Sequence, residues 1–298
     1  MALREYLIGE VTEDYADGLL TRREAMRRLG LLAVSSGAAA ALLAACARGA
    51  ETPSATQTPS APPKSEPGAT KAGPKAETVR FTGPSGQLQA AWAAASKPKA
   101  AVLVIHENRG LTPHFQDLVG RFAAEGYSAL CVDLLSPEGG TGSLTDPAAA
   151  PTALADAHQA RLLGDLRAGI DELKRRLPAA KVGAVGFCFG GGMTWLLMNT
   201  GEARLAAAVP FYGPAPKDPD FSEAKAAVLG VYGGLDQRVN DTRPAAEAAL
   251  RKAGLTHKIR TFEGANHAFF NDTGERYEAK AAGEAWTELL AWFETHLT

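Results

Sequence analysis

Cysteine is scarce in this chain of 298 residues, and the three copies, Cys46, Cys131 and Cys188, argue against a disulfide-stabilised fold. No charge of one sign is in excess: 31 Lys and Arg stand against 33 Asp and Glu. This balance gives no reason to expect nucleic acid or an anionic surface as a partner. No spacing of His, Cys and Asp typical of a metal site is present either. The remaining composition, 46% hydrophobic with 31 Gly, suits one α/β domain and an additional segment.

The first 46 residues have the order of an export signal. Residues 21–27, Thr-Arg-Arg-Glu-Ala-Met-Arg, resemble a twin-arginine signal, although Ala25 stands where a large apolar residue is usual. An apolar run of small residues, 29–45, follows and is short for a membrane span. It ends in Leu-Ala-Ala-Cys, which resembles a bacterial lipobox whose cysteine, here Cys46, is lipidated after cleavage. The alternative is a simple secretory or amphipathic leader in which Cys46 is incidental.

Residues 47–76 are rich in Pro, Ser, Thr, Ala, Lys and Gly and have no apolar periodicity, which predicts a disordered linker. Such a linker would let a lipid-anchored enzyme stand clear of the membrane surface. We therefore expect an exported protein that is held by a lipid on Cys46, on the outer side of the cytoplasmic membrane or in the periplasm.

Strands and helices alternate through residues 77–298, which predicts one catalytic domain with a mostly parallel sheet and helices on both faces. The disordered leader and linker would precede this domain. The expected strands are 78–81, 88–93, 101–105, 128–132, 181–187, 205–212, 226–232 and 257–262. The expected helices are 113–125, a long one that follows the loop 134–152 and ends at 177, 189–199, 242–254 and 275–297.

The sequence Gly186-Phe187-Cys188-Phe189-Gly190 matches the nucleophile-elbow motif G-x-S-x-G, with sulfur in place of oxygen. The two glycines allow a strand and a helix to pass closely at a sharp turn. The N-terminus of the following helix would favour the thiolate of Cys188. The competing interpretation is a buried structural cysteine in a glycine-rich connection.

Two further residues follow Cys188 in the order typical of the α/β-hydrolase fold, an acid and then a histidine. Asp236 follows the strand 226–232, and His267 lies just past the last strand. In this hypothesis His267 takes the thiol proton, and Asp236 fixes the tautomer of His267. Asp133 and Asp241 are competing acids, which we interpret as a turn residue and as the cap of the helix 242–254.

The remaining polar groups at the strand ends suggest an oxyanion hole. The backbone N–H of Phe189 follows the nucleophile, and a second N–H is expected after the strand 101–105, at Asn108. His106, next in the same loop, is expected to be a packed strand-end histidine.

The motifs around Cys188, Asp236 and His267, with Glu107 after an apolar strand, resemble the dienelactone hydrolase family over residues 77–298. The resemblance implies an α/β-hydrolase fold, no cofactor, and hydrolysis of a small ester or lactone, as by a carboxymethylenebutenolidase, through a thioester. It also implies that Glu107 contacts the resting thiol and modulates it. The alternative is a loop carboxylate paired with Arg109.

The chain departs from the family at the pair of residues that holds a substrate carboxylate. A Ser after the catalytic histidine and an Arg three positions further are replaced by Ala268 and Asn271. Arg109 is the candidate substitute for the missing charge, unless the substrate is not anionic.

Two other functions remain open at this point. One is a membrane-tethered domain that binds a ligand or a protein partner without catalysis. The other is a thioesterase or peptidase, although the loop 134–152 is too small for a peptide-binding cap. For the hydrolase we expect a rate that rises across the neutral pH range as His267 loses its proton.

Overall fold

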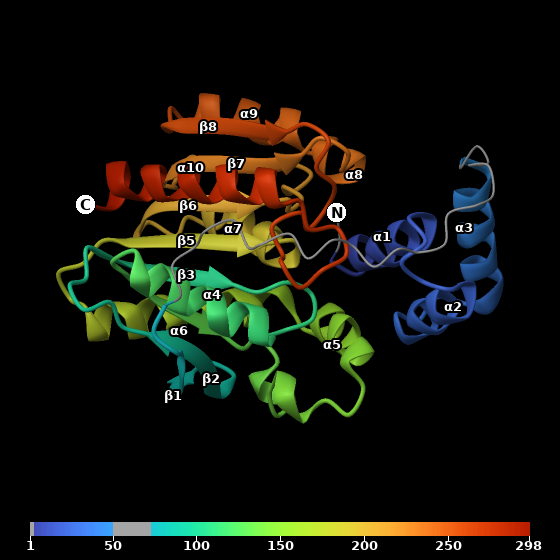
Figure 1. The fold of residues 1–298 in the computed structure, drawn as a ribbon, viewed down its shortest axis with the longest axis horizontal. Helices are drawn as coiled ribbons and strands as arrows, with labels where there is room; N and C mark the ends of the chain where they lie inside the picture. Colours follow the sequence, from blue (N-terminus) through green and yellow to red (C-terminus); the bar gives the residue numbers. More distant parts are fainter. Residues whose placement is uncertain (1–2, 50–72) are drawn as a thin grey trace.

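The computed structural model describes residues 3–49 and 73–298, and its second part is built on an eight-stranded sheet (Figure 1). In spatial order the strands run β1-β2-β4-β3-β5-β6-β7-β8. Strands β1 and β2 pair antiparallel with their neighbours, and β3 to β8 are parallel. The strand bounds are β1 (Glu77–Gly83), β2 (Gly86–Ala93), β3 (Ala100–Ile105), β4 (Tyr127–Val132), β5 (Val182–Phe187), β6 (Leu205–Phe211), β7 (Ala227–Gly233) and β8 (His257–Phe262).

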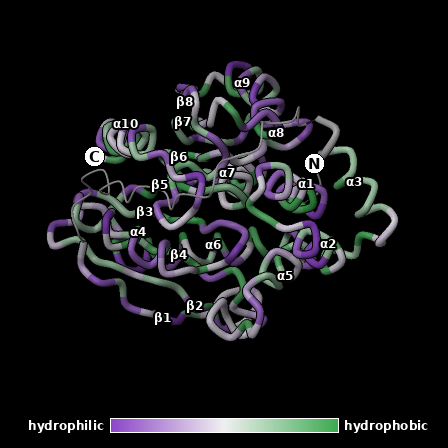
Figure 2. The backbone as a smooth tube through the Cα atoms, turned by 45° about the vertical axis from the view of Figure 1, so that its right-hand side comes forward, coloured by the Kyte–Doolittle hydropathy of each residue, from purple (hydrophilic) through white to green (hydrophobic). Residues whose placement is uncertain are grey.

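Helices cover both faces of this sheet, as predicted for a parallel sheet whose central strands are apolar throughout. Helices α4 (Pro113–Ala124) and α10 (Ala279–Leu297) lie on one face, where Phe122 of α4 packs on Trp286 and Phe293 of α10. Helices α6 (Gln159–Arg176) and α7 (Phe189–Asn199) lie on the other face, and α9 (Arg243–Lys252) lies beside β8 (Figure 1). The hydrophobic colouring of Figure 2 is concentrated in the central strands between these layers.

One helix expected after the loop 134–152 is in fact two. The loop contains three short 3₁₀ turns, η1 (Ser136–Glu138), η2 (Thr141–Ser143) and η3 (Pro147–Ala149). Helix α5 (Ala150–Asp156) then ends at Ala157, where the backbone becomes extended, and α6 begins after His158. Arg4 forms an ion pair with Asp156, so α5 serves as a support for the N-terminal segment.

The expectation of a disordered leader is wrong for residues 3–49. They form α1 (Leu3–Ala16), α2 (Arg22–Leu31) and α3 (Ser36–Gly49), which pack on one another at the end of the molecule opposite the C-terminus (Figure 1). The physical reason is that each helix has apolar side chains to bury against its neighbours. The buried apolar residues of this segment are Tyr6, Leu7, Val11, Ala25, Leu29, Leu32, Ala39 and Leu43.

Part of the predicted export signal and linker lies outside the described residues. Helix α3 runs to Gly49, three residues into the expected linker, and residues 50–72 are not described. The described backbone includes Cys46, but not its side chain. Among the helices of residues 3–49 and 73–298, none has the length and hydrophobicity to cross a membrane.

Candidate active site

Cys188 occupies the sharp turn between β5 and α7 that the sequence predicts. Its backbone has φ 55° and ψ −117°, a conformation that non-glycine residues rarely adopt and that is typical of a nucleophile elbow. A Cβ atom on Gly186 would lie 2.0 Å from the carbonyl oxygen of Gly190, and one on Gly190 would lie 2.2 Å from that of Ile105. Both glycines are therefore required for the strand and the helix to pass at this distance.

Asp236 and His267 meet at the same edge of the sheet. The Oδ2 atom of Asp236 lies 2.6 Å from Nδ1 of His267, and both side chains are buried. The Oδ1 atom of Asp236 accepts a hydrogen bond from the backbone N–H of Val239, at the start of the short helix α8 (Gln237–Asn240). The carboxylate thus caps a helix and orients an imidazole, and a ring nitrogen of that imidazole lies within 4.8 Å of Cys188 Sγ.

The two competing acids lie elsewhere. Asp133 accepts hydrogen bonds from the backbone N–H groups of Leu135 and Thr141, at 3.0 and 2.7 Å, which confirms it as a turn residue. Asp241 does not cap the following helix, because Thr242 stands at the N-cap position of α9. Asp241 ends α8 instead and accepts a hydrogen bond from the side chain of Gln237 at 2.5 Å.

The loop after β3 supplies Glu107, Asn108 and Arg109 to the lining of the cleft. Glu107 accepts hydrogen bonds from Tyr212 Oη at 3.2 Å and from Asn271 Nδ2 at 2.8 Å, rather than pairing with Arg109. Asn271 thus holds this carboxylate in place. Arg109 is exposed at the rim of the cleft.

His106, in the same loop, is buried and packed, as expected. Its Nδ1 atom lies 2.7 Å from the carbonyl oxygen of Glu107, and its Nε2 accepts a hydrogen bond from the N–H of Leu134. Burial lowers the pKa of His106, although the charge of Asp133 works in the other direction.

Both predicted oxyanion-hole residues lie near the nucleophile. Phe189 is the first residue of α7, and the first N–H groups of a helix have no partner within the helix. Asn108 lines the same cleft as Cys188 and His267, which has a volume of about 600 Å³. The two N–H groups remain the predicted donors to an oxyanion.

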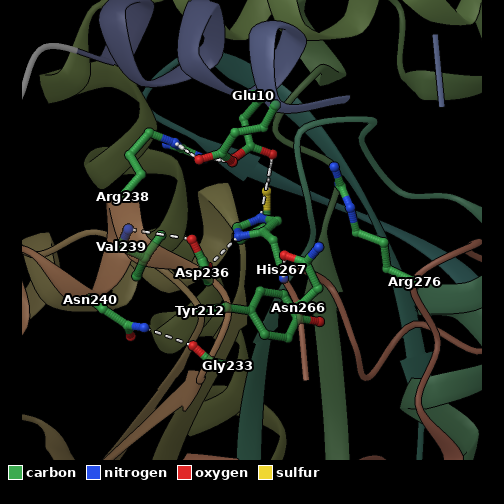
Figure 3. Close-up of polar contacts among 12 residues, drawn as sticks. Glu10, Tyr212, Gly233, Asp236, Arg238, Val239, Asn240, Asn266, His267 and Arg276 are labelled. Atoms are coloured by element: carbon green, nitrogen blue, oxygen red, sulfur yellow. Dashed lines mark hydrogen bonds and ion pairs between the residues drawn. The ribbon is translucent and has the colours of Figure 1, made fainter. Parts of the chain in front are cut away.

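Helix α1 enters this cleft and contacts the nucleophile directly, which the sequence reasoning missed. Tyr6 Oη lies 3.2 Å from Cys188 Sγ, and Glu10 Oε2 lies 3.6 Å from the same sulfur. Figure 3 shows Glu10 extending from α1 towards His267, whose Nε2 atom is 3.3 Å from Glu10 Oε2. The carboxylate beside the resting thiol is thus Glu10, whereas Glu107 is held by Tyr212 and Asn271.

The charges at the site favour an imidazolium beside a neutral thiol. Burial and then the negative charge of Glu10 raise the pKa of Cys188 to about 11. Burial works to lower the pKa of His267, but Glu10, Asp236 and Cys188 together raise it well above its usual value. Burial works against the charge of Glu10 itself, but His267 and Arg238 keep the pKa of this carboxyl lowered.

Two arginines of the catalytic domain hold α1 in the cleft. Arg238, two residues after Asp236, forms ion pairs with Glu10 and Glu13, the latter at 2.9 Å. Arg276 binds Asp14 and Asp17 through hydrogen bonds of 2.8 and 2.7 Å. The helical spacing of Tyr6, Leu7, Glu10 and Val11 is the signal that could have revealed a helix with one buried face.

Glu10, Cys188 and His267 also form the one set of side chains in the described residues with the atom types and proximity of a metal site. Glu10 is already neutralised by Arg238, and His267 Nδ1 is held by Asp236. Two of the three groups are thus already paired with protein side chains, and we assign no metal to this set.

Comparison with known proteins gives consistent matches over the catalytic domain. The model of the dienelactone hydrolase family matches residues 88–297. A "putative carboxymethylenebutenolidase" of Methylorubrum extorquens is 32% identical over 213 residues, which are 67% of this chain and 73% of that protein. A protein of the same name from Escherichia coli O157:H7 is 31% identical over 212 residues, 67% of this chain and 78% of that one.

Solved structures give the same result. The crystal structure of a "putative dienelactone hydrolase" of Klebsiella pneumoniae superposes with a TM-score of 0.65 at 30% identity, covering 74% of this chain and 98% of that one. A dienelactone hydrolase-like promiscuous phosphotriesterase from metagenomic libraries superposes with a TM-score of 0.64 at 26% identity, covering 75% of this chain and 98% of that one. The helices α1–α3 lie outside the residues that the family model matches.

Proposed function

This chain belongs to the dienelactone hydrolase family, and we propose that it hydrolyses a small ester or lactone through a Cys188–His267–Asp236 triad and a thioester intermediate. The observation that carries this proposal is the geometry of three side chains at one edge of the sheet. A carboxylate oxygen lies 2.6 Å from His267 Nδ1, and a nitrogen of the same ring lies within 4.8 Å of the sulfur of a cysteine held in a nucleophile elbow.

The first half of the reaction forms the thioester. His267 Nε2 accepts the proton of Cys188, and the sulfur attacks the substrate carbonyl carbon. The N–H groups of Phe189 and Asn108 are the proposed donors to the negative oxygen of the tetrahedral intermediate. When the intermediate collapses, the bond to the leaving oxygen breaks, and the His267 imidazolium gives that oxygen its proton.

The second half releases the acid. His267, neutral again, takes a proton from water, and the resulting hydroxide attacks the thioester carbonyl. The sulfur then leaves and regains a proton from His267, which restores the starting thiol. Asp236 does not exchange protons in this scheme, because its contribution is to hold the tautomer of His267 and to stabilise the imidazolium.

The test is hydrolysis of activated aryl esters and small lactones by three forms of the chain: unchanged, Cys188→Ala and Cys131→Ala. Each form is cut between residues 50 and 72 after folding and freed of its N-terminal fragment, because α1 otherwise contacts the sulfur. Cys131 is a matched control, since it is a free, buried cysteine in β4 and lies outside the cleft lining. We expect Cys188→Ala to lose activity by a factor of about 10³ or more and Cys131→Ala to retain it.

The alternatives give different results in the same assay. A binding or scaffold domain without catalysis would hydrolyse none of these compounds in any form. A thioesterase would hydrolyse acyl thioesters far faster than the matched oxygen esters. Ester turnover that survives in Cys188→Ala would refute the proposed nucleophile.

The export and anchoring of the chain also remain proposals. They are supported by Arg22 and Arg23, which are exposed at the start of α2, and by the apolar composition of α3. Cleavage before Cys46 would remove α1 and α2 from the mature protein. The mass of the N-terminal peptide, purified from the cell envelope of an expressing bacterium, tests this, because a lipid-modified Cys46 is expected and an unprocessed Met1 would contradict it.

A further inference from the structure

Helix α1 closes off the groups that the proposed reaction uses. A substrate carbonyl carbon has to come within about 3–3.5 Å of the attacking sulfur, and Tyr6 Oη already lies 3.2 Å from Cys188 Sγ. Glu10 Oε2 lies 3.6 Å from the same sulfur and 3.3 Å from His267 Nε2 (Figure 3). With α1 in this position Cys188 is only 3% exposed, so a substrate can reach the sulfur only after α1 has moved.

The charge of Glu10 also opposes the first step of the reaction. Burial and then Glu10 raise the pKa of Cys188 to about 11, which disfavours the thiolate. Burial works to lower the pKa of His267, but Glu10 is the first of the charges that raise it. While α1 remains in the cleft, it therefore favours a neutral thiol beside an imidazolium, and an imidazolium has no free nitrogen to accept the thiol proton.

Ion pairs attach this N-terminal segment to the catalytic domain at several points. They join Arg238 to Glu10 and Glu13, Arg276 to Asp14 and Asp17, Arg4 to Asp156, and Arg27 to Asp146. Arg238 Cζ also lies 4.6 Å from the centre of the Tyr6 ring, so the residue that pairs with Glu10 also packs on the tyrosine beside the sulfur. All of these contacts are noncovalent, and α1 can therefore dissociate once the chain between the segment and the domain is cut.

The segment is a separate unit of the fold. Helices α1, α2 and α3 pack on one another, and every strand of the eight-stranded sheet lies after them, from Glu77 onwards. The family model begins at residue 88, and Cys188, Asp236 and His267 all belong to the part that it matches. Loss of residues 3–49 therefore removes neither a strand of the sheet nor a member of the proposed triad.

We propose that residues 3–49 are an intramolecular inhibitor, so that the intact chain is a latent precursor and separation of this segment from the catalytic domain opens Cys188 to substrate. This inference rests on the proposed function, to which it adds a step of control. The cut proposed before Cys46 falls after α1 and α2. The processing that would deliver the enzyme outside the cytoplasm would therefore also release its inhibitor.

The experiment uses the folded whole chain with a protease site inserted between residues 50 and 72 and an affinity tag at the N-terminus. The uncut chain is compared with the chain that has been cut after folding and freed of the tagged fragment. Two rates are measured: alkylation of Cys188 by iodoacetamide, read by mass spectrometry of its peptide, and hydrolysis of an activated aryl ester. Cys131 is the internal control, because it is a free, fully buried cysteine in β4 and lies outside the cleft lining.

Release of the fragment should raise the alkylation rate of Cys188 and the rate of ester hydrolysis roughly tenfold or more, and it should leave Cys131 unreactive. In the uncut chain, Tyr6→Ala should raise the alkylation rate of Cys188 roughly tenfold, because the change removes a contact with the sulfur and another with Arg238. Leu31→Ala is the matched control. Leu31 lies in the same segment but is 37% exposed, so its replacement should leave the alkylation rate unchanged.

Three results would overturn the inference. Equal alkylation of Cys188 before and after release would mean that α1 does not block the sulfur. A parallel rise at Cys131 would mean that the segment is needed to keep the catalytic domain folded. Equal rates in Tyr6→Ala and Leu31→Ala would mean that the face of α1 in the cleft does not cause the block. Alkylation needs no ester hydrolysis, so a released chain whose Cys188 reacts with iodoacetamide but which cleaves no ester would contradict the proposed function and leave the block by α1 supported.

Discussion

Replacing Glu10 with Gln should make Cys188 reactive at lower pH in the intact chain. Burial and then Glu10 raise the pKa of this thiol to about 11, and the carboxylate oxygen lies 3.6 Å from the sulfur. Two unit charges at that distance repel each other by ~1.2 kcal/mol at a water-like dielectric and by ~4.6 kcal/mol at an effective dielectric of about 20. Even the smaller value predicts that Glu10→Gln has a roughly tenfold higher fraction of Cys188 thiolate near pH 8 than the unchanged chain.

The assay is the rate of Cys188 alkylation by iodoacetamide as a function of pH, read on the peptide that contains Cys188. Glu13→Gln is the matched control: Glu13 also binds Arg238, but it makes no contact with the sulfur that the structure records. Both variants weaken the hold on α1, and Glu10→Gln alone removes the charge beside the thiol. We expect only Glu10→Gln to move the midpoint of the pH profile downwards.

An unchanged midpoint in Glu10→Gln would refute the electrostatic reasoning. A rise in rate at every pH with the same midpoint would mean that Glu10 blocks access to the sulfur without controlling its ionisation. An equal downward shift in both variants would mean that movement of α1, rather than the charge of Glu10, sets the thiol pKa.

Three further predictions concern the triad, the elbow and the pH dependence. Asp236→Asn should lower kcat/KM for an activated ester by about 10³-fold or more, because His267 loses the partner of its Nδ1 atom. Gly190→Ala should lower the Tm and reduce the free energy of unfolding by about 1–3 kcal/mol, because the new Cβ would meet the carbonyl oxygen of Ile105. Gly283→Ala is the control, since Gly283 faces open space on α10 and its replacement should not lower the Tm. Burial works to lower the pKa of His267, but Glu10, Asp236 and Cys188 raise it, so the rise of activity with pH should lie above the range of an unperturbed imidazole. Release of α1 removes the contribution of Glu10 and should move that rise in activity to lower pH.

The sheet and the meeting of Cys188, Asp236 and His267 at one edge could be predicted because both follow from local patterns. Central strands such as β3 are apolar along their whole length, and a parallel sheet brings the ends of β5 and β7 to one edge. The elbow is a contiguous motif, and its two glycines are required by backbone contacts. Cys188, Asp236 and His267 therefore come together for reasons that are visible in the sequence.

The position of α1 could not be predicted in this way, because it depends on contacts between residues more than 170 positions apart, such as Tyr6 with Cys188. Because such long-range contacts are not visible in the sequence, the sequence suggested Glu107, rather than Glu10, as the carboxylate beside the thiol. Glu107 follows a strand near the site, but the amide of Asn271 and the hydroxyl of Tyr212 take its carboxylate. Asp241 was misassigned for a local reason, since α8 inserts one short turn before α9.

The most direct test of the account is the mass of the enzyme during turnover. The chain released from its N-terminal segment is mixed with an activated ester and quenched in acid within the first turnovers, and its peptides are examined for a bound acyl group. We predict an acyl group on the peptide that contains Cys188, in a form that hydroxylamine removes, and none in Cys188→Ala. Two results would contradict the thiol mechanism. One is an acyl group bound to another residue during ester hydrolysis. The other is the absence of any acyl group on Cys188 together with continued activity of Cys188→Ala.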